Sequence, residues 1–174
     1  FVNNTNLRTD EYGGCFPNKI RIATEIVEGI RKSVGEDFLI IFRIPAMDML
    51  EGGMSWEEIC TLGQALENSG VSIVSTHFSW HESPVPTIAT MVPRAAFTSV
   101  TKRLKSVINV PVITSNRINM PDVAETVLAN GDADFVSMAR PFLADGKIFE
   151  KIKEGREDEI NTCIACNQAC LDHA

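Results

Sequence analysis

The sequence lacks an apolar run of the roughly 20 residues that a membrane-spanning helix needs. It also lacks internal repeats, low-complexity tracts and long linkers. Basic residues are fewer than acidic ones, 16 against 23, and the formal net charge of −7 argues against general affinity for nucleic acid or for an anionic membrane. What is present, 44% hydrophobic residues in a chain of 174, is the composition of an ordinary globular protein with one core.

Four short runs that are nearly continuous in Ile, Val and Phe predict strands buried on both faces. They cover residues 38–44, 71–76, 110–114 and 133–138. Helical patterns separate these runs: apolar stripes over residues 20–34 and 97–107, a capping-box pair at Ser55 and Glu58, a helix from Pro121 to Gly131, and a last helix over about 141–154. This alternation predicts an α/β fold with a parallel sheet and crossover helices.

Two architectures fit this order of elements. One is a small four-stranded α/β domain, and the other is the second half of a (β/α)8 TIM barrel, strands five to eight with their helices. A whole barrel needs about 250 residues and eight strands, whereas this chain has four predicted strands and opens with a helix that lacks a preceding strand. The chain begins at Phe1 rather than at a methionine, so we expect its natural start to lie outside these residues.

Polar side chains follow the predicted strands at the end where parallel α/β proteins carry their sites. Arg43 ends the first strand, where a cation needs either an anionic ligand or a buried salt bridge. His77 and His81 follow the second strand, and histidine suits proton transfer near neutral pH. Arg117 and Arg140 follow the third and fourth strands, each just before a helix. The loops after strands seven and eight of a barrel form its usual phosphate site, so this pair indicates a phosphorylated cofactor or substrate.

Three of the five cysteines crowd the C-terminal end of the chain, which is unlike a disulfide scaffold. Cys163, Cys166 and Cys170 have the spacing C-x2-C-x3-C, and thiolates so close in sequence can share one soft metal centre. The fourth ligand would lie either beyond the end of the chain or at His173, so an iron–sulfur cluster and a structural Cys3His zinc site both stay open. A thioredoxin-type pair is less favoured, because the segment does not follow a first strand.

Several short segments of the sequence resemble motifs of a known protein family. The segment N-L-R-T-D-E-Y-G-G at residues 6–14 precedes N-K-I-R at 18–21. In that family, the residue at the position of Lys19 is usually an arginine. Further along are W-H-E at 80–82, P-T-I-A-T at 86–90, T-S-N-R-I-N at 114–119, S-M-A-R-P-F at 137–142 and the cysteine segment. Together these residues resemble the old yellow enzyme family of FMN barrels, and within it the branch of the bacterial NADPH-dependent 2,4-dienoyl-CoA reductases. That branch joins the FMN barrel to an iron–sulfur segment and a FAD/NADPH-binding domain.

The resemblance implies roles for the arginines. Arg43, on barrel strand five, would contact the FMN ring and favour negative charge on the reduced flavin. Arg117, with Ala139 and Arg140, would hold the FMN phosphate. Electrons would pass from NADPH through FAD and the cluster to FMN, which would give a hydride to the conjugated thioester.

The resemblance also implies a substrate site and a cluster site. His81 would be the catalytic histidine that helps a tyrosine, absent from these residues, to donate a proton. Glu82, Ser83 and Pro84 would line the acyl-CoA site. Three of the four ligands of a [4Fe–4S] cluster would be Cys163, Cys166 and Cys170.

The implied organisation is that of part of an enzyme. Residues 1–160 would be the C-terminal half of the FMN barrel and residues 161–174 the start of the cluster segment, with FAD and NADPH bound by a domain outside the chain. We expect a cytoplasmic protein that alone does not reduce dienoyl-CoA, whose unpaired sheet edges favour self-association. The alternatives are a non-enzymatic zinc-binding α/β module and a related FMN/iron–sulfur enoate reductase or amine dehydrogenase.

Overall fold

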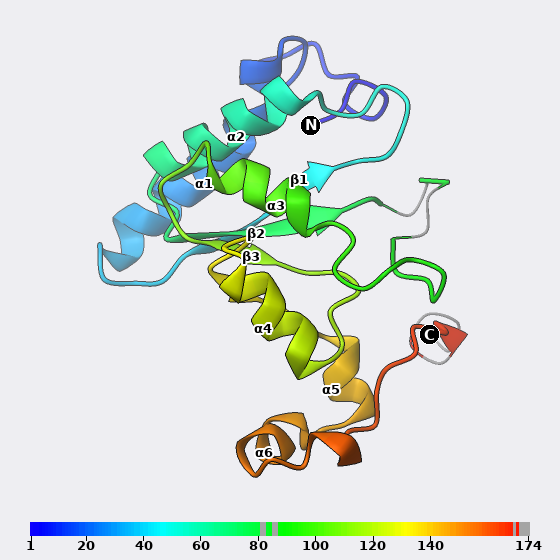
Figure 1. Cartoon of the computed structure of the whole chain (residues 1–174). Helices are drawn as coiled ribbons and strands as arrows, with labels where there is room; N and C mark the ends of the chain where they lie inside the picture. Colours follow the sequence, from blue (N-terminus) through cyan, green and yellow to red (C-terminus); the bar gives the residue numbers. More distant parts are fainter. Residues whose placement is uncertain (81–82, 85–86, 169, 171–174) are drawn as a thin grey trace.

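The computed structural model describes residues 1–80, 83–84, 87–168 and 170, and its elements alternate between helix and strand (Figure 1). In chain order they are α1 (Phe16–Val34), β1 (Ile41–Met47), α2 (Trp56–Asn68), β2 (Ile73–Phe78), α3 (Thr98–Lys105), β3 (Val112–Thr114), α4 (Pro121–Ala129), β4 (Phe135–Val136), α5 (Arg140–Ala144), α6 (Ile148–Lys153) and the 3-10 turn η1 (Glu157–Glu159).

The four strands form one parallel sheet in the order β1-β2-β3-β4. The predicted parallel α/β sheet is therefore confirmed, although each strand begins two or three residues later than the apolar run that predicted it. The first run shows the reason. Phe38 and Leu39 are each 57% exposed and precede the ladder, and the Phe38 carbonyl accepts a hydrogen bond from Arg31 at 2.7 Å. Apolar character therefore marks the run, whereas pairing with β2 sets where the strand starts.

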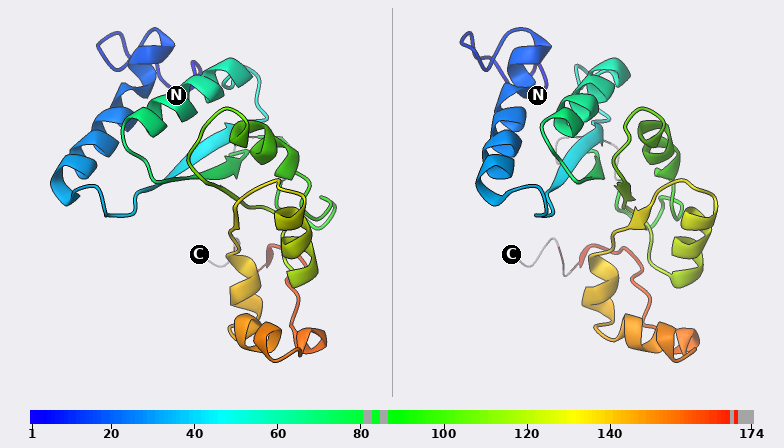
Figure 2. Two further views of the ribbon diagram at one scale, coloured as in Figure 1. Left: turned by 60° about the vertical axis from the view of Figure 1, so that its left-hand side comes forward. Right: turned by 90° about the vertical axis from the view of Figure 1, so that its left-hand side faces the viewer.

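The sheet has one covered face and one open face. Helices α1 to α4 form an arc around one side of the strands (Figure 2), and Ile44, Val74 and Val112 point into the fully buried core beneath them. Side chains alternate along a strand, so the opposite face carries the other residues. On it Ile41 and Phe135 are each 49% exposed. A sheet with helices on one side only is the arrangement of an opened barrel, in which the bare face is the barrel interior.

Local interactions fix where the helices lie. The predicted capping box is confirmed at the start of α2: the Glu58 backbone N–H donates to Ser55 Oγ at 3.2 Å, and the Ser55 N–H donates to Glu58 Oε2 at 2.9 Å. At the end of α1, Arg31 donates from Nη2 to the Gly70 carbonyl at 2.7 Å and to Ser72 Oγ at 2.9 Å. This one side chain therefore joins the end of α1 to the segment that leads into β2.

The single last helix predicted over about 141–154 is wrong, because the structure has two short helices there, α5 and α6. The break falls at Asp145 and Gly146. Asp145 is 6% exposed, and its carboxylate accepts from the Lys147 backbone N–H at 3.0 Å and from Lys151 Nζ at 2.7 Å. Aspartate competes with the helix for backbone N–H groups, so it ends α5 and turns the chain into α6. In the part of the chain that the structure describes, every helix is too short or too polar to cross a membrane.

Candidate functional site

A cavity of about 280 Å³ lies at the carboxyl edge of the sheet, and it gathers the arginines singled out from the sequence. Arg43, Arg117, Ala139 and Arg140 all line it. Arg117 follows β3, and Ala139 and Arg140 follow β4. The structure therefore brings together the four residues that were predicted to bind FMN. The prediction that Arg43 ends the first strand is wrong, because pairing with β2 continues past it and Arg43 lies inside β1.

Arg43 reaches this cavity from the open face of the sheet. It stands opposite Ser75 of β2 in the parallel register, and Ser75 lines the same cavity. Arg43 is exposed and makes no salt bridge with any described residue, so the buried-salt-bridge interpretation of this arginine is not supported.

Arg117 is held in an unusual backbone conformation. It and Asn116 are consecutive residues with φ values of 58° and 69°, in the left-handed region that non-glycine residues rarely occupy. Arg117 Nε donates to the Val92 carbonyl at 2.8 Å, and the Ala95 N–H donates back to the Arg117 carbonyl at 3.1 Å. Val92 and Ala95 therefore hold the strained turn in place and fix the direction of the guanidinium.

Arg140 joins the cavity to the cysteine segment. Its Nη1 donates to the Ile88 carbonyl at 3.0 Å and to Asn167 Oδ1 at 2.6 Å. Asn167 lies between Cys166 and Cys170, and the carbonyl of Cys163 accepts from Asn119 Nδ2 at 2.7 Å. The segment thus packs against the loops that form the cavity rather than extending away from the barrel.

The cavity is strongly electropositive. None of the described residues that line it is acidic. Burial, with the like charges of Arg140 and Arg94, lowers the pKa of Arg117, while the nearby Cys163 raises it. Cations placed together without a carboxylate are costly unless an anion joins them. The arrangement therefore fits a phosphate group, which several guanidinium N–H groups and serine hydroxyls can bind at once.

Three serines of this cavity were missed as single candidates: Ser75, Ser115 and Ser137. The Ser137 N–H donates to the Thr114 carbonyl at 2.9 Å, and Ser115 Oγ donates to the Thr76 carbonyl at 3.0 Å. Ser115 and Ser137 each follow a strand, which could have indicated a role in binding. Serine is so common in loops that this position alone does not predict a binding residue.

The cysteines are not arranged as a finished metal centre. All five are free thiols, and Cys166 and Cys170 are exposed. Among the described residues no group of three or more His, Cys, Asp or Glu side chains is placed to hold a metal ion. Three cysteine thiolates suit a soft metal by their chemistry, but their placement in this structure does not form a metal site.

The predicted substrate residues are described only in part. His81 and Glu82 lie outside the described residues. Pro84 is exposed, and Ser83 Oγ donates to the Met49 carbonyl at 3.0 Å, so the loop after β2 rests on the loop after β1. The indole N–H of Trp80 is buried and has no hydrogen-bond partner among the residues that the structure describes, which is uncommon for a buried donor.

Comparison with known proteins gives the family. Residues 1–159 match the sequence profile of the NADH:flavin oxidoreductase / NADH oxidase family. The chain belongs to this family. Membership in this flavin oxidoreductase family supports FMN as the cofactor.

Relatives of this flavin oxidoreductase chain match nearly all of it but are much longer. It is 41% identical to the metal reductase of Desulforamulus reducens over 97% of this chain and 25% of the relative. It is 38% identical to the NADH oxidase of Thermoanaerobacter brockii over 96% of this chain and 26% of the relative. The chain therefore spans about a quarter of the length of the curated relatives it matches.

A solved structure of 2-naphthoyl-CoA reductase with 2-naphthoyl-CoA has a TM-score of 0.93 to this chain at 37% identity, covering 98% of this chain and 26% of the reductase. The expected fold class is confirmed: the four-stranded parallel α/β sheet with its helices corresponds to part of a TIM-barrel flavin oxidoreductase.

Proposed function

We propose that this chain is the FMN-phosphate and acyl-thioester portion of a reductase acting on conjugated acyl-CoA thioesters of the 2,4-dienoyl-CoA type. The observation that carries the proposal is the acid-free cavity lined by Arg43, Arg117 and Arg140 at the carboxyl edge of the sheet. The similarity to 2-naphthoyl-CoA reductase supports the substrate class, because that enzyme was solved with a conjugated acyl-CoA.

In this proposal the cavity binds the phosphate end of FMN, which when bound supplies hydride transfer to the substrate. Arg117 and Arg140 bind the phosphate oxygens beside Ala139. Both guanidinium groups are already oriented by the carbonyls of Val92 and Ile88, so little side-chain entropy is lost when the anion binds. Arg43, on the open face, would present a permanent positive charge to the flavin and so favour its negatively charged reduced form.

His81 is proposed as the catalytic histidine, and Glu82, Ser83 and Pro84 as residues that line the acyl-CoA site. The hydrogen bond from Ser83 to the Met49 carbonyl supports this, because it holds the loop near the carboxyl end of β1. A histidine in such a loop can hold a proton for delivery near neutral pH, and its pKa range suits that step.

Cys163, Cys166 and Cys170 are proposed as ligands of a [4Fe–4S] cluster, and FAD and NADPH as cofactors bound outside this chain. The contact of Arg140 with Asn167 supports the cluster proposal, since it holds the cysteine segment against the proposed FMN phosphate site. Free cysteines and thiolate ligation are consistent with the proposed cytoplasmic location. The exposed apolar residues of the open face, Ile41 and Phe135, support the proposed self-association of the chain.

The experiment is a substrate panel on the complete enzyme that carries this chain. We expect NADPH-dependent reduction of a 2,4-dienoyl-CoA, with no comparable turnover of cinnamate or dimethylamine as representative enoate and amine substrates. His81→Ala should lower turnover while flavin stays bound. Full turnover in His81→Ala would refute the catalytic role, and preference for cinnamate or dimethylamine would replace the substrate class.

Metal content tests the cluster independently of turnover. Cys166→Ser should lower bound iron and the broad absorbance near 400 nm typical of such clusters. Cys60→Ser is the matched control, because Cys60 lies in α2 and is part of no proposed site. Equal iron in both variants, or stoichiometric zinc in the parent, would refute the cluster assignment.

A further inference from the structure

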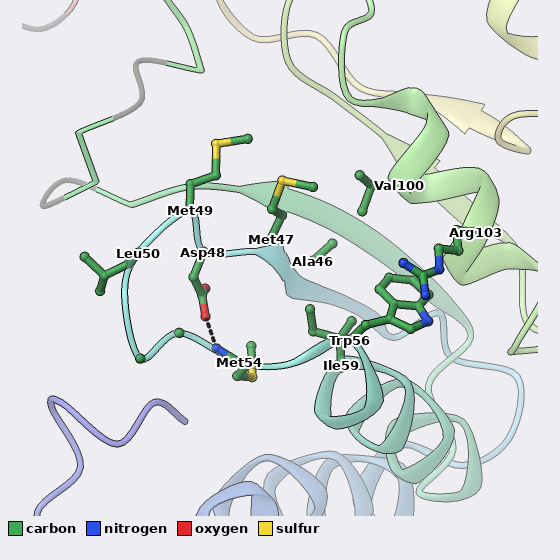
Figure 3. Close-up of a pocket in the computed structure, with 12 residues that line it drawn as sticks. Ala46, Met47, Asp48, Met49, Leu50, Met54, Trp56, Ile59, Val100 and Arg103 are labelled. Atoms are coloured by element: carbon green, nitrogen blue, oxygen red, sulfur yellow. Dashed lines mark hydrogen bonds between the residues drawn. The ribbon is translucent and has the colours of Figure 1, made fainter.

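A second cavity, of about 310 Å³, lies on the other side of the sheet from the arginine cavity. It opens between the loop that follows β1, the start of α2 and helix α3 (Figure 3). Ala46, which lines it, faces the helix-covered side, whereas Arg43 faces the open side. The two cavities therefore share no lining residue, and the FMN proposal uses none of the residues of the second one.

The walls of this cavity are apolar and adaptable. Met47, Met49 and Met54 line it together with Ile59 and Val100. Unbranched thioether side chains adjust to ligands of different shape, which is why methionine is common at adaptable binding surfaces. The volume lies at the lower end of the roughly 300–1,000 Å³ of small-molecule sites, so a small ligand fits better than a nucleotide.

One cation stands at an end of the cavity. The Arg103 guanidinium lies over the Trp56 ring at 4.0 Å from the ring centroid (Figure 3). Among the described residues it has no salt bridge and its side chain donates no hydrogen bond, although Glu57 is close enough to interact electrostatically. Stacking orders the side chain and leaves its planar N–H groups unused, which prepares it to bind a carboxylate.

An acidic group stands away from Arg103, on the far side of the cavity. Asp48 Oδ2 accepts from the Met54 backbone N–H at 2.9 Å, which closes the loop over residues 48–54 (Figure 3). A ligand that extends from Arg103 along the methionines therefore meets a carboxylate at its other end. A second negative charge on the ligand would be repelled there.

We propose that this cavity binds a small apolar monocarboxylate. The carboxylate pairs with Arg103, the apolar body lies against the methionines and Trp56, and the uncharged end approaches Asp48. The ligand must carry one negative charge and one apolar body, and the site discriminates against dicarboxylates. It needs no flavin, so it stands whether or not the arginine cavity binds FMN.

The test is a titration of the complete enzyme that carries this chain with octanoate, followed by NMR of methionine methyl groups and indole N–H groups. We expect saturable shifts of the Met47, Met49 and Met54 methyls and of the Trp56 indole. Met138 and the Trp80 indole, which do not line the cavity, serve as internal references. Octanedioate and uncharged octanol should each bind at least about tenfold more weakly than octanoate.

Variants test the contribution of the Arg103 charge separately from that of the space in the cavity. Arg103→Gln should weaken octanoate binding by about ten- to a hundredfold, since it removes a charged hydrogen bond. Lys102→Gln is the matched control: it removes a neighbouring charge that pairs instead with Asp132 at 3.0 Å, so octanoate affinity should not change. Val100→Phe should weaken binding by filling the cavity. Absence of saturable shifts, equal affinity in Arg103→Gln and the parent, or octanedioate binding as tightly as octanoate would each overturn the proposal.

Discussion

Replacing Thr101 by valine removes the middle of a buried hydrogen-bond chain. Thr101 Oγ1 lies 2.9 Å from Thr76 Oγ1 and 2.9 Å from Thr114 Oγ1, and all three threonines are fully buried. Thr76 Oγ1 also donates to the Ile113 carbonyl at 3.1 Å. Because each hydroxyl has one proton, the protons run in one direction, from Thr114 to Thr101 to Thr76 to that carbonyl. The chain joins α3 to β2 and β3, the strands that lead into the arginine cavity.

Valine has nearly the shape of threonine, so the expected cost of Thr101→Val comes from hydrogen bonding. Two hydrogen bonds of about 0.5–1.5 kcal/mol each are lost, and the Thr114 hydroxyl is left buried without its acceptor. We expect the free energy of unfolding to fall by about 2–4 kcal/mol. Thr101→Ser keeps the hydroxyl and loses one methyl group, which costs about 1 kcal/mol.

Urea unfolding followed by circular dichroism measures both variants. Thr126→Val is the matched control, because the Thr126 hydroxyl is exposed and bonds only to the Asp122 carbonyl of its own helix. Its free energy of unfolding should change by less than about 0.5 kcal/mol. If Thr101→Val proves as stable as Thr101→Ser, the buried chain does not stabilise the sheet and the reasoning is refuted.

Three further predictions concern single residues. The Lys151 ammonium, with the backbone N–H groups of Asn161 and Lys147, lowers the pKa of Asp145 from 3.8 to about 2. The ionised carboxylate therefore stabilises the fold above about pH 4, and this stabilisation is lost as the pH falls toward 2. Asp145→Asn should flatten that part of the stability curve in acid titrations, and an unchanged curve would count against the assignment. Ser55→Ala should lower the free energy of unfolding by about 1 kcal/mol in urea, whereas no loss would mean that the cap is dispensable. Gly13→Ala should lower the thermal midpoint, since the new Cβ would lie 2.0 Å from the Arg8 carbonyl oxygen. Gly146→Ala is the control, because open space surrounds Gly146 and no such clash arises. Equal midpoints for the two variants would contradict the close packing of Gly13 against Arg8.

The sequence predicted the sheet well because the signals of parallel strands are local. Apolar runs, the capping box at Ser55 and the proline that opens α4 each act within a few residues, and all three appear in the structure. The division between α5 and α6 was missed because it depends on Asp145, whose partners include the distant Asn161 N–H at 3.0 Å. An apolar pattern does not reveal such a contact, since the pattern on either side of Asp145 continues at helical spacing.

The candidate site was partly predictable for the same reason. Arg117 and Arg140 could be found because parallel strands bring their carboxyl ends to one edge, whatever the loops do. The contact between Arg140 and Asn167, at 2.6 Å, could not be found, because 27 residues separate them and no periodicity links them. The methionine cavity was also missed, since methionines after a strand are usually core residues and only the stacking of Arg103 on Trp56 distinguishes this group.

The most direct test of the central proposal is to compare the binding of FMN and riboflavin, which differ only by the phosphate. We expect the complete enzyme, stripped of flavin, to bind FMN at least about tenfold more tightly than riboflavin in a fluorescence titration, through charged hydrogen bonds to the arginine cavity. Arg117→Ala and Arg140→Ala should each reduce this ratio, with riboflavin affinity little changed. Equal affinity for FMN and riboflavin in the parent, or an unchanged ratio in both variants, would contradict the assignment of this cavity to the flavin phosphate.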